Sequence, residues 1–236
     1  MRAFAAFRFK NWACRSYRGC KALVHTGVLM ALTFGGAAGE PGRAGDRPVR
    51  IVALGDSLTA GYGLPAQAAF PAKLEGALKA KGYAVEIVNA GVSGDTAARG
   101  LARLDWSVPD GTDAVIVALG ANDMLLGVDP AMTRKALAQI IRRLRDRNVL
   151  VLLAGMRAAP NLGRAYGNEF ERIYADLARE NGVLFYPFFL EGIAAQPRFN
   201  LQDGVHPNAA GIDAIVARIL PQVEELITRV QAQRGT

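Results

Sequence analysis

Hydrophobic positions after residue 48 form two kinds of segment that alternate along the chain. Short, nearly continuous apolar runs indicate strands that are buried on both faces. Longer segments with apolar residues every three to four positions indicate amphipathic helices. The apolar runs predict strands at 49–54, 84–88, 114–119, 149–153 and 183–186, and the periodic segments predict helices at 70–81, 97–104, 130–147, 168–180 and 209–229.

Residues at the helix ends support this division. Asp129 precedes Pro130, which is typical of a helix start because aspartate caps the helix and proline fits its first position. Asn181-Gly182 is typical of a helix end, and Asn208 can cap the last helix. Strands that alternate with helices predict the α/β class, a three-layer α/β/α sandwich around a five-stranded parallel sheet. Functional residues of such sheets collect in the loops at the carboxyl ends of the strands.

The first 39 residues have a different pattern. A basic stretch ends at Lys21, an apolar run follows over 22–34, and small residues occupy 35–39. This order is typical of a secretory signal peptide. A permanent membrane anchor is the alternative, but the apolar run is shorter than the ~20 residues of a spanning helix.

These first 39 residues, called the leader below, set the expected domain organisation. We expect a signal peptide at 1–39 that is cleaved between Ala38 and Glu40, a linker at 40–48 and one domain at 49–230. The protein would then be periplasmic or secreted, with no stable membrane anchor after cleavage.

Most of the net positive charge and both cysteines lie in the leader. Six of the 28 basic residues lie before residue 40, where no acid occurs, so 22 basic and 21 acidic residues remain, a net charge of +1. A near-neutral body lacks the basic surface that nucleic acids require, so we expect no nucleic-acid partner. Both cysteines, Cys14 and Cys20, are in the leader, so the mature protein would have neither a disulfide nor a cysteine metal site.

A candidate nucleophile follows the first predicted strand, in the segment Gly55-Asp56-Ser57-Leu58. Glycine permits unusual backbone angles, so a tight strand-to-helix turn can expose Ser57. A helix N-cap or turn serine is the alternative. This segment alone does not decide between them.

His206 is the histidine that could activate this serine, because the only other histidine, His25, lies in the leader. Imidazole is the usual base at neutral pH. Asp203 lies three residues earlier, a spacing that lets its carboxylate bind the Nδ1 proton and fix the tautomer. A surface histidine beside a capping aspartate is the alternative. One histidine without cysteines is a poor zinc site, and we expect no metal and no cofactor.

Two further loops offer hydrogen-bond donors. The backbone N–H of Gly94 follows the second predicted strand, and the side-chain amide of Asn122 follows the third. Such donors stabilise an oxyanion in acyl transfer. Each residue alone could belong to an ordinary turn. Together, however, the four loops bring a nucleophile, a base and two donors to one edge of the sheet.

The segment around Ser57 resembles the first motif of the SGNH, or GDSL, hydrolase superfamily. Gly94 within 91–95, Asn122 within 120–123 and the Asp203–His206 pair resemble its second, third and last motifs, in the same order and with similar spacing. The likeness spans residues 50–226. It is strongest to the bacterial periplasmic branch of thioesterase I, protease I or lysophospholipase L1, often described as arylesterases.

The resemblance implies a flavodoxin-like SGNH hydrolase fold. It also implies hydrolysis of a small-molecule acyl ester or thioester, such as an aryl ester or a lysophospholipid. The implied catalytic residues are Ser57, Asp203 and His206, and the implied oxyanion hole consists of the N–H groups of Ser57 and Gly94 and the amide of Asn122.

Two neighbours of these motifs need separate mention. Asp56 adjoins Ser57 in sequence, but an adjacent residue is poorly placed to orient a histidine on another loop, so we assign it a structural role. Ala121 occupies a position where the superfamily often has glycine, and this position varies.

We expect the protein to be a monomer.

Two apolar loops bear on the substrate. Met124, Leu125 and Leu126 follow the third motif, and Pro160 and Leu162 follow the fourth predicted strand. These residues could line an acyl pocket. The alternative is that Leu125 and Leu126 simply begin the core.

Two other functions compete with ester hydrolysis at this point. A carbohydrate O-deacetylase of the same superfamily would favour short acyl groups and polar, aromatic-lined clefts, against which the apolar loops argue. A non-catalytic periplasmic binding module would use the same loops without covalent chemistry.

Overall fold

The computed structural model describes residues 47–236, so the predicted signal peptide and the first seven residues of the predicted linker lie outside the described residues. All neighbouring strands of the single five-stranded sheet are parallel, in the order β2-β1-β3-β4-β5. The predicted parallel sheet is thereby confirmed. Its strands are β1 (Val49–Gly55), β2 (Val85–Gly91), β3 (Ala114–Ala118), β4 (Leu150–Ala154) and β5 (Leu184–Tyr186).

The strand order places a topological switch point at β1. From β1 the chain passes to β2 on one side and then crosses to β3 on the other side. The register pairs Gly55 with Gly91 of β2 and with Ala118 of β3, so the three strands end at the same level. Ligands of open parallel sheets bind in the crevice at such a point.

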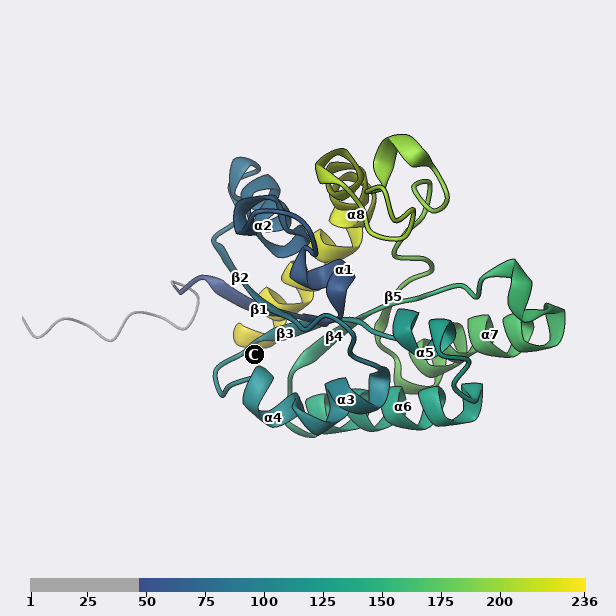
Figure 1. Ribbon diagram of the computed structural model, residues 1–236. Coiled ribbons are helices and arrows are strands. Elements are labelled where there is room, and N and C mark those ends of the chain that lie inside the picture. The colour runs from purple at the N-terminus through teal and green to yellow at the C-terminus, as the bar shows by residue number, and fades with distance from the viewer. Residues whose placement is uncertain (1–46) are drawn as a thin grey trace, which may run out of the picture. The chain divides into compact units, whose positions relative to one another are not determined.

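Helices cover both faces of the sheet (Figure 1). One face carries α2 (Phe70–Ala80) and α8 (Ala209–Arg234). The other carries α3 (Ala97–Ala102), α4 (Leu104–Ser107), α6 (Pro130–Asp146) and α7 (Arg164–Asn181). This arrangement confirms the predicted three-layer α/β/α sandwich.

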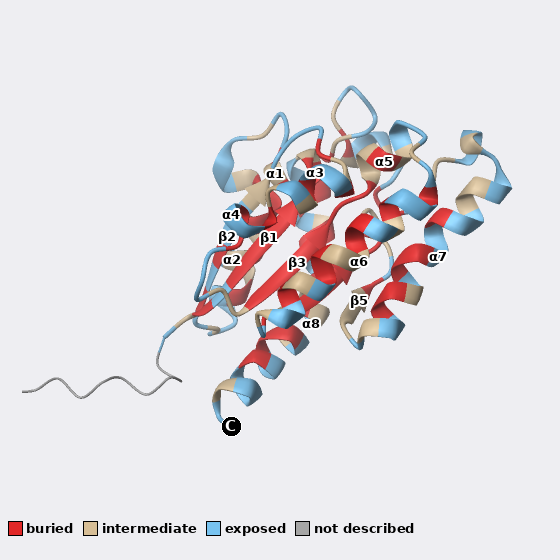
Figure 2. Cartoon of the chain, turned by 90° about the horizontal axis from the view of Figure 1, so that it is seen from below, coloured by how far each residue is buried: buried red, intermediate tan, exposed pale blue. Residues whose placement is uncertain are grey.

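The core lies between these layers (Figure 2). All five residues of β3 are buried. Leu137, Ile140, Ile141 and Leu144 of α6 are also fully buried and recur at the spacing of one helix face. Burying one such side chain contributes about 1.5–3 kcal/mol, so these layers hold the strand ends firmly in place.

Three predicted helix boundaries are wrong. The segment predicted as one helix at 97–104 breaks at Arg103, whose side chain turns inward, and continues as α4. The helix predicted from 168 begins at Arg164. The last helix extends five residues further, to Arg234, because Arg234 binds Asp113 and fastens the final turn.

Several short helices were not predicted, because their sequences show no hydrophobic periodicity. The short α-helices are α1 (Ser57–Ala60) and α5 (Ala121–Leu125), and the 3₁₀ turns are η1 (Ala66–Ala68), η2 (Pro160–Leu162) and η3 (Pro197–Phe199). A helix of four or five residues is about one turn long, so hydrophobic periodicity cannot reveal it. These two α-helices nevertheless begin at the carboxyl edge of the sheet and carry Ser57 and Asn122.

Candidate active site

Ser57 is the first residue of α1, which starts directly after β1. Its neighbour Asp56 caps this helix, because the Asp56 Oδ1 atom accepts a hydrogen bond of 3.0 Å from the Leu58 N–H. Asp56 is buried, and this burial raises the pKa of its carboxyl to about 7. Its side chain is therefore engaged beneath the helix, in keeping with the structural role expected of it.

His206 and Asp203 lie on the loop before α8 and meet Ser57 across 149 positions of sequence. The His206 Nε2 atom is 2.9 Å from the Ser57 Oγ atom, and the His206 Nδ1 atom is 2.7 Å from the Asp203 Oδ2 atom. The structure thus brings together the three residues predicted to be catalytic. The order hydroxyl, imidazole, carboxylate allows a proton to pass from Ser57 to His206.

Asp203 is held as an anion. Its Oδ1 atom accepts from the backbone N–H groups of His206, at 3.0 Å, and of Val205, at 2.9 Å. These bonds, led by that from the His206 N–H, lower the pKa of the Asp203 carboxyl to about 2. The carboxylate is consequently ionised at neutral pH and can stabilise a positive charge on the imidazole.

The ring of Tyr62 lies against His206, with the two ring centroids 4.4 Å apart. This contact restricts the movement of the imidazole, and the Tyr62 side chain remains exposed at the surface. Sequence reasoning missed this residue. The only local signal was its place one turn after Ser57.

Of the two further predicted donors, Gly94 lies on the loop that follows β2, and Asn122 lies on α5, which follows β3. Gly94 adopts a positive φ of 85°, which a residue with a side chain rarely adopts. The Asn122 Nδ2 atom donates to the carbonyl of Asp95 at 3.0 Å, and a primary amide has a second N–H to offer. Because Ser57 is the first residue of a helix, its N–H has no acceptor within that helix.

Asp123 follows Asn122 in α5, and its role was also missed from the sequence. It is buried, and its carboxylate accepts from the Ala97 N–H at 2.8 Å and from the Thr133 hydroxyl at 3.0 Å. It therefore ties α5 to the starts of α3 and α6. Burial raises the pKa of the Asp123 carboxyl.

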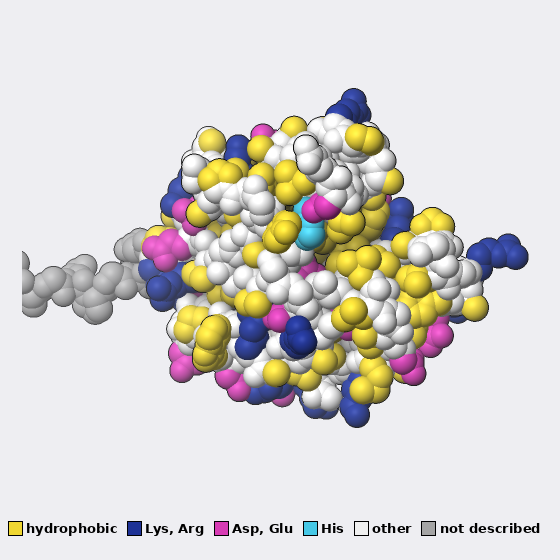
Figure 3. Space-filling model, viewed as in Figure 1, with side chains coloured by type: hydrophobic (Ala, Val, Ile, Leu, Met, Phe, Trp, Pro, Cys, Tyr) yellow, Lys and Arg dark blue, Asp and Glu magenta, His cyan; other side chains and the backbone are white. Residues whose placement is uncertain are grey.

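The apolar residues predicted to contact substrate remain near the surface. Leu125 is 56% exposed and Leu126 is 70% exposed, so the alternative that they begin the core is wrong. Met124 and Leu162 are half-buried, and Pro160 is exposed on η2. In the space-filling view the histidine opens onto the surface with hydrophobic side chains on either side (Figure 3).

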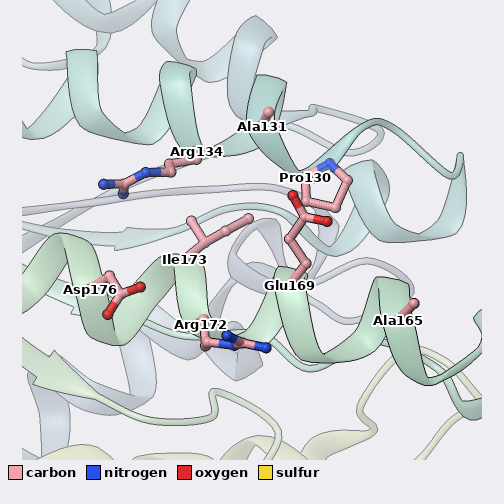
Figure 4. A pocket seen from close by; sticks show the side chains of 8 residues that line it. All are labelled: Pro130, Ala131, Arg134, Ala165, Glu169, Arg172, Ile173 and Asp176. Atoms are coloured by element: carbon pink, nitrogen blue, oxygen red, sulfur yellow. The ribbon is translucent and has the colours of Figure 1, made fainter.

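A hollow of about 460 Å³ lies between α6 and α7 (Figure 4). Four of its eight lining residues are charged, and none is a predicted catalytic residue. The lining residues are Pro130, Ala131, Arg134, Ala165, Glu169, Arg172, Ile173 and Asp176. We therefore base the chemistry on the geometry at Ser57 rather than on this hollow.

Two properties of the described chain bear on other functions. None of the helices between residues 47 and 236 has the length and apolarity needed to span a membrane. The same residues include no group of three or more His, Cys, Asp or Glu side chains arranged to hold a metal ion.

Comparison with known proteins agrees with the geometry. The chain is 37% identical to thioesterase 1/protease 1/lysophospholipase L1 of Escherichia coli strain K12, over 84% of this chain and 90% of that protein. It is 38% identical to an arylesterase of Vibrio mimicus, over 67% of this chain and 80% of that protein. The crystal structure of AlinE4, an SGNH-hydrolase family esterase, matches with a TM-score of 0.65 and 44% identity, over 76% of this chain and 96% of that one. The sequence model of the GDSL-like lipase/acylhydrolase family matches residues 53–214, and the chain belongs to this family.

Proposed function

We propose that this protein is a serine hydrolase that cleaves carboxylic ester and thioester bonds through an acyl-enzyme on Ser57. One observation carries the proposal. The Ser57 hydroxyl, the His206 imidazole and the Asp203 carboxylate form a continuous chain of contacts of 2.9 and 2.7 Å. This is the arrangement that activates a serine hydroxyl at neutral pH.

The reaction follows from these contacts. The Ser57 Oγ atom attacks the acyl carbonyl carbon while its proton passes to His206 Nε2, and Asp203 stabilises the resulting imidazolium. The tetrahedral oxyanion is bound by the N–H groups of Ser57 and Gly94 and by the Asn122 amide. When the intermediate collapses, His206 returns the proton to the leaving alcohol or thiol. Water then attacks the acyl-enzyme with His206 as base, which releases the carboxylic acid and restores Ser57.

The substrate class follows from the rim of the site and from the relatives. Leu125 and Leu126 expose large apolar side chains beside Asn122, and we assign Met124, Pro160 and Leu162 to the same acyl-binding region. An apolar rim favours apolar acyl groups over acetylated sugars. The names of the relatives, arylesterase and thioesterase 1/protease 1/lysophospholipase L1, likewise point to ester and thioester substrates rather than to acetylated sugars.

A substrate panel tests this proposal. The protein is assayed with p-nitrophenyl esters from acetate to palmitate, with acyl-CoA, with lysophosphatidylcholine and with acetylated oligosaccharides. We expect turnover of esters with medium or long acyl chains, because each added methylene in contact with an apolar wall favours binding. Turnover confined to acetate and acetylated sugars would instead support a carbohydrate deacetylase. The absence of turnover and of labelling by a fluorophosphonate would support a binding module.

We also propose that the protein is exported to the periplasm or secreted. The support is the basic, apolar and small-residue order of residues 1–39. Mass spectrometry of the exported protein is expected to find an N-terminus between Ala38 and Glu40. An intact leader on the mature protein would contradict this proposal.

Replacement of Asn122 by alanine is expected to lower kcat by about 10²–10³-fold with KM little changed, because one oxyanion donor is lost. Steady-state kinetics with a p-nitrophenyl ester measures the effect. Asn181→Ala is a matched control, since the Asn181 amide also donates to a backbone carbonyl, that of Leu177 at 2.9 Å, but at the far end of α7. A kcat for Asn122→Ala equal to that of the control would remove Asn122 from the oxyanion hole.

A further inference from the structure

The guanidinium group of Arg103, at the break between α3 and α4, binds three acceptors at once. Its Nη2 atom donates to the Gly55 carbonyl at 2.9 Å, its Nε atom to Asp95 Oδ2 at 2.6 Å, and its Nη1 atom to the Ser107 hydroxyl at 2.8 Å. The Arg103 side chain is only 15% exposed and that of Asp95 only 8% exposed. A planar guanidinium group in which each of the three nitrogens donates to a partner holds these partners in one geometry.

Asp95 connects the Arg103 guanidinium group to Gly94 and Asn122, two of the proposed oxyanion donors. Its N–H donates to the Val92 carbonyl at 3.1 Å and so closes the turn that gives Gly94 its positive φ. Its own carbonyl accepts from the Asn122 amide at 3.0 Å. A displacement of Asp95 would therefore shift Gly94 and Asn122 together.

Gly55 connects the same guanidinium group to the third proposed donor, the Ser57 N–H. Its carbonyl accepts from Arg103 and also from the Val92 N–H at 3.0 Å. Gly55 lies two residues before Ser57, at the end of β1. The guanidinium thus joins the strand that carries the nucleophile to the turn that carries Gly94.

We propose that Arg103 and Asp95 are positioning residues that fix the three oxyanion donors relative to one another, an inference that rests on the proposed function. Neither residue needs to touch the substrate. An oxyanion hole stabilises the tetrahedral intermediate only when its donors lie about 2.7–3.1 Å from the developing charge. A displacement of about 1 Å at such a site can cost about 10²-fold in rate.

Arg103→Met tests this inference, because methionine keeps the apolar stem and removes all three hydrogen bonds. We expect kcat for a p-nitrophenyl ester to fall about 10²-fold with KM changed less than about threefold, the signature of interactions made only in the transition state. Arg103→Lys retains the charge but not the planar guanidinium group, and a smaller fall of about tenfold is expected. Affinity for an alkylboronic acid, which forms a tetrahedral adduct with Ser57, should decline in step with kcat.

Arg234→Met provides a control matched in burial. Arg234 Nη2 also lies 2.6 Å from a carboxylate, Asp113 Oδ2, and the two side chains are 12% and 9% exposed. Asp113 directly precedes β3, so the pair lies at the opposite end of the strands from Ser57. We expect kcat of Arg234→Met to stay within about threefold of the parent value, and the melting temperatures of both variants show how far each change destabilises the fold.

Equal kcat values for Arg103→Met and Arg234→Met would overturn the inference, since Arg103 would then be only structural. If Arg103→Met does not fold, Arg103→Lys decides in the same comparison. The double variant Asp95→Asn/Arg103→Met should have the same kcat as Arg103→Met, because both changes break one unit. Labelling of the parent protein by a fluorophosphonate separates the two hypotheses: its failure would contradict the proposed function, and its success with an unaffected Arg103→Met would contradict only the positioning role.

Discussion

Replacement of Ser57 by alanine is expected to lower kcat for a p-nitrophenyl ester by about 10⁵–10⁶-fold, as far as removal of the nucleophile does in other serine hydrolases. The change deletes the atom that forms the acyl-enzyme. His206 would then have no hydroxyl within reach and could activate only water. Because the side chain of Ser57 is small and only half-buried, the fold and the melting temperature should be preserved.

Labelling with a fluorophosphonate measures the same property independently of turnover. The parent protein is expected to add one phosphonyl group, detected by mass spectrometry, and Ser57→Ala to add none. Ser93 and Ser107 remain in the variant and act as internal controls. Persistent labelling or turnover within tenfold of the parent value would show that another residue is the nucleophile.

The sequence was sufficient to predict the sheet and its layers. Strands buried on both faces, such as β3, must be almost wholly apolar, and this pattern survives in any local window of sequence. The long amphipathic helices are predictable for the same reason, as the four buried positions of α6 illustrate. The break at Arg103 was not predictable, because it depends on Gly55 and Asp95, which are distant or on another element.

The candidate site likewise contains some residues that the sequence predicts and others that it does not. Ser57, Gly94 and Asn122 follow the ends of strands, and the rule that parallel strands end at one edge was enough to predict that they share an edge of the sheet. Tyr62 and Asp123 carry no such positional signal, since their roles consist of contacts with His206 and with Ala97 and Thr133. The contacts of Tyr62 and Asp123 are therefore a part of the site that only the structure reveals.

Backbone geometry decided which of the two aspartates, Asp56 or Asp203, was predicted to orient His206. Both carboxylates are close to catalytic candidates in sequence. A residue adjacent to Ser57 shares its backbone, which directs the two side chains apart, and the Asp56 carboxylate indeed caps α1 at the Leu58 N–H. The Asp203 carboxylate instead lies 2.7 Å from His206 Nδ1. A spacing of three residues around a turn therefore permits a contact that direct adjacency does not.

Replacement of Asp203 by asparagine is expected to lower kcat by about 10⁴-fold, because it reverses the tautomer of His206. The Oδ1 atom of the new side chain can still accept from the Val205 and His206 N–H groups, so the loop should keep its shape. The amide N–H₂ group would then face Nδ1 and require it to accept a hydrogen bond. The imidazole proton would move to Nε2, which could no longer accept the proton of Ser57.

The Asp203 carboxylate is expected to act on His206 across the whole neutral pH range. The pKa of Asp203 is lowered to about 2, so the carboxylate is ionised throughout the neutral range and is lost only as the pH falls towards 2. Protonation of Asp203 should accordingly contribute nothing to the pH dependence of the parent kcat between about pH 5 and about pH 8. Asp213→Asn is the control, since Asp213 is an exposed residue of α8 that pairs with Lys73, and its kcat should match the parent value. If Asp203→Asn kept more than a tenth of the parent kcat, the orientation of His206 would have to come from its other contacts, chiefly the ring of Tyr62 and the loop backbone.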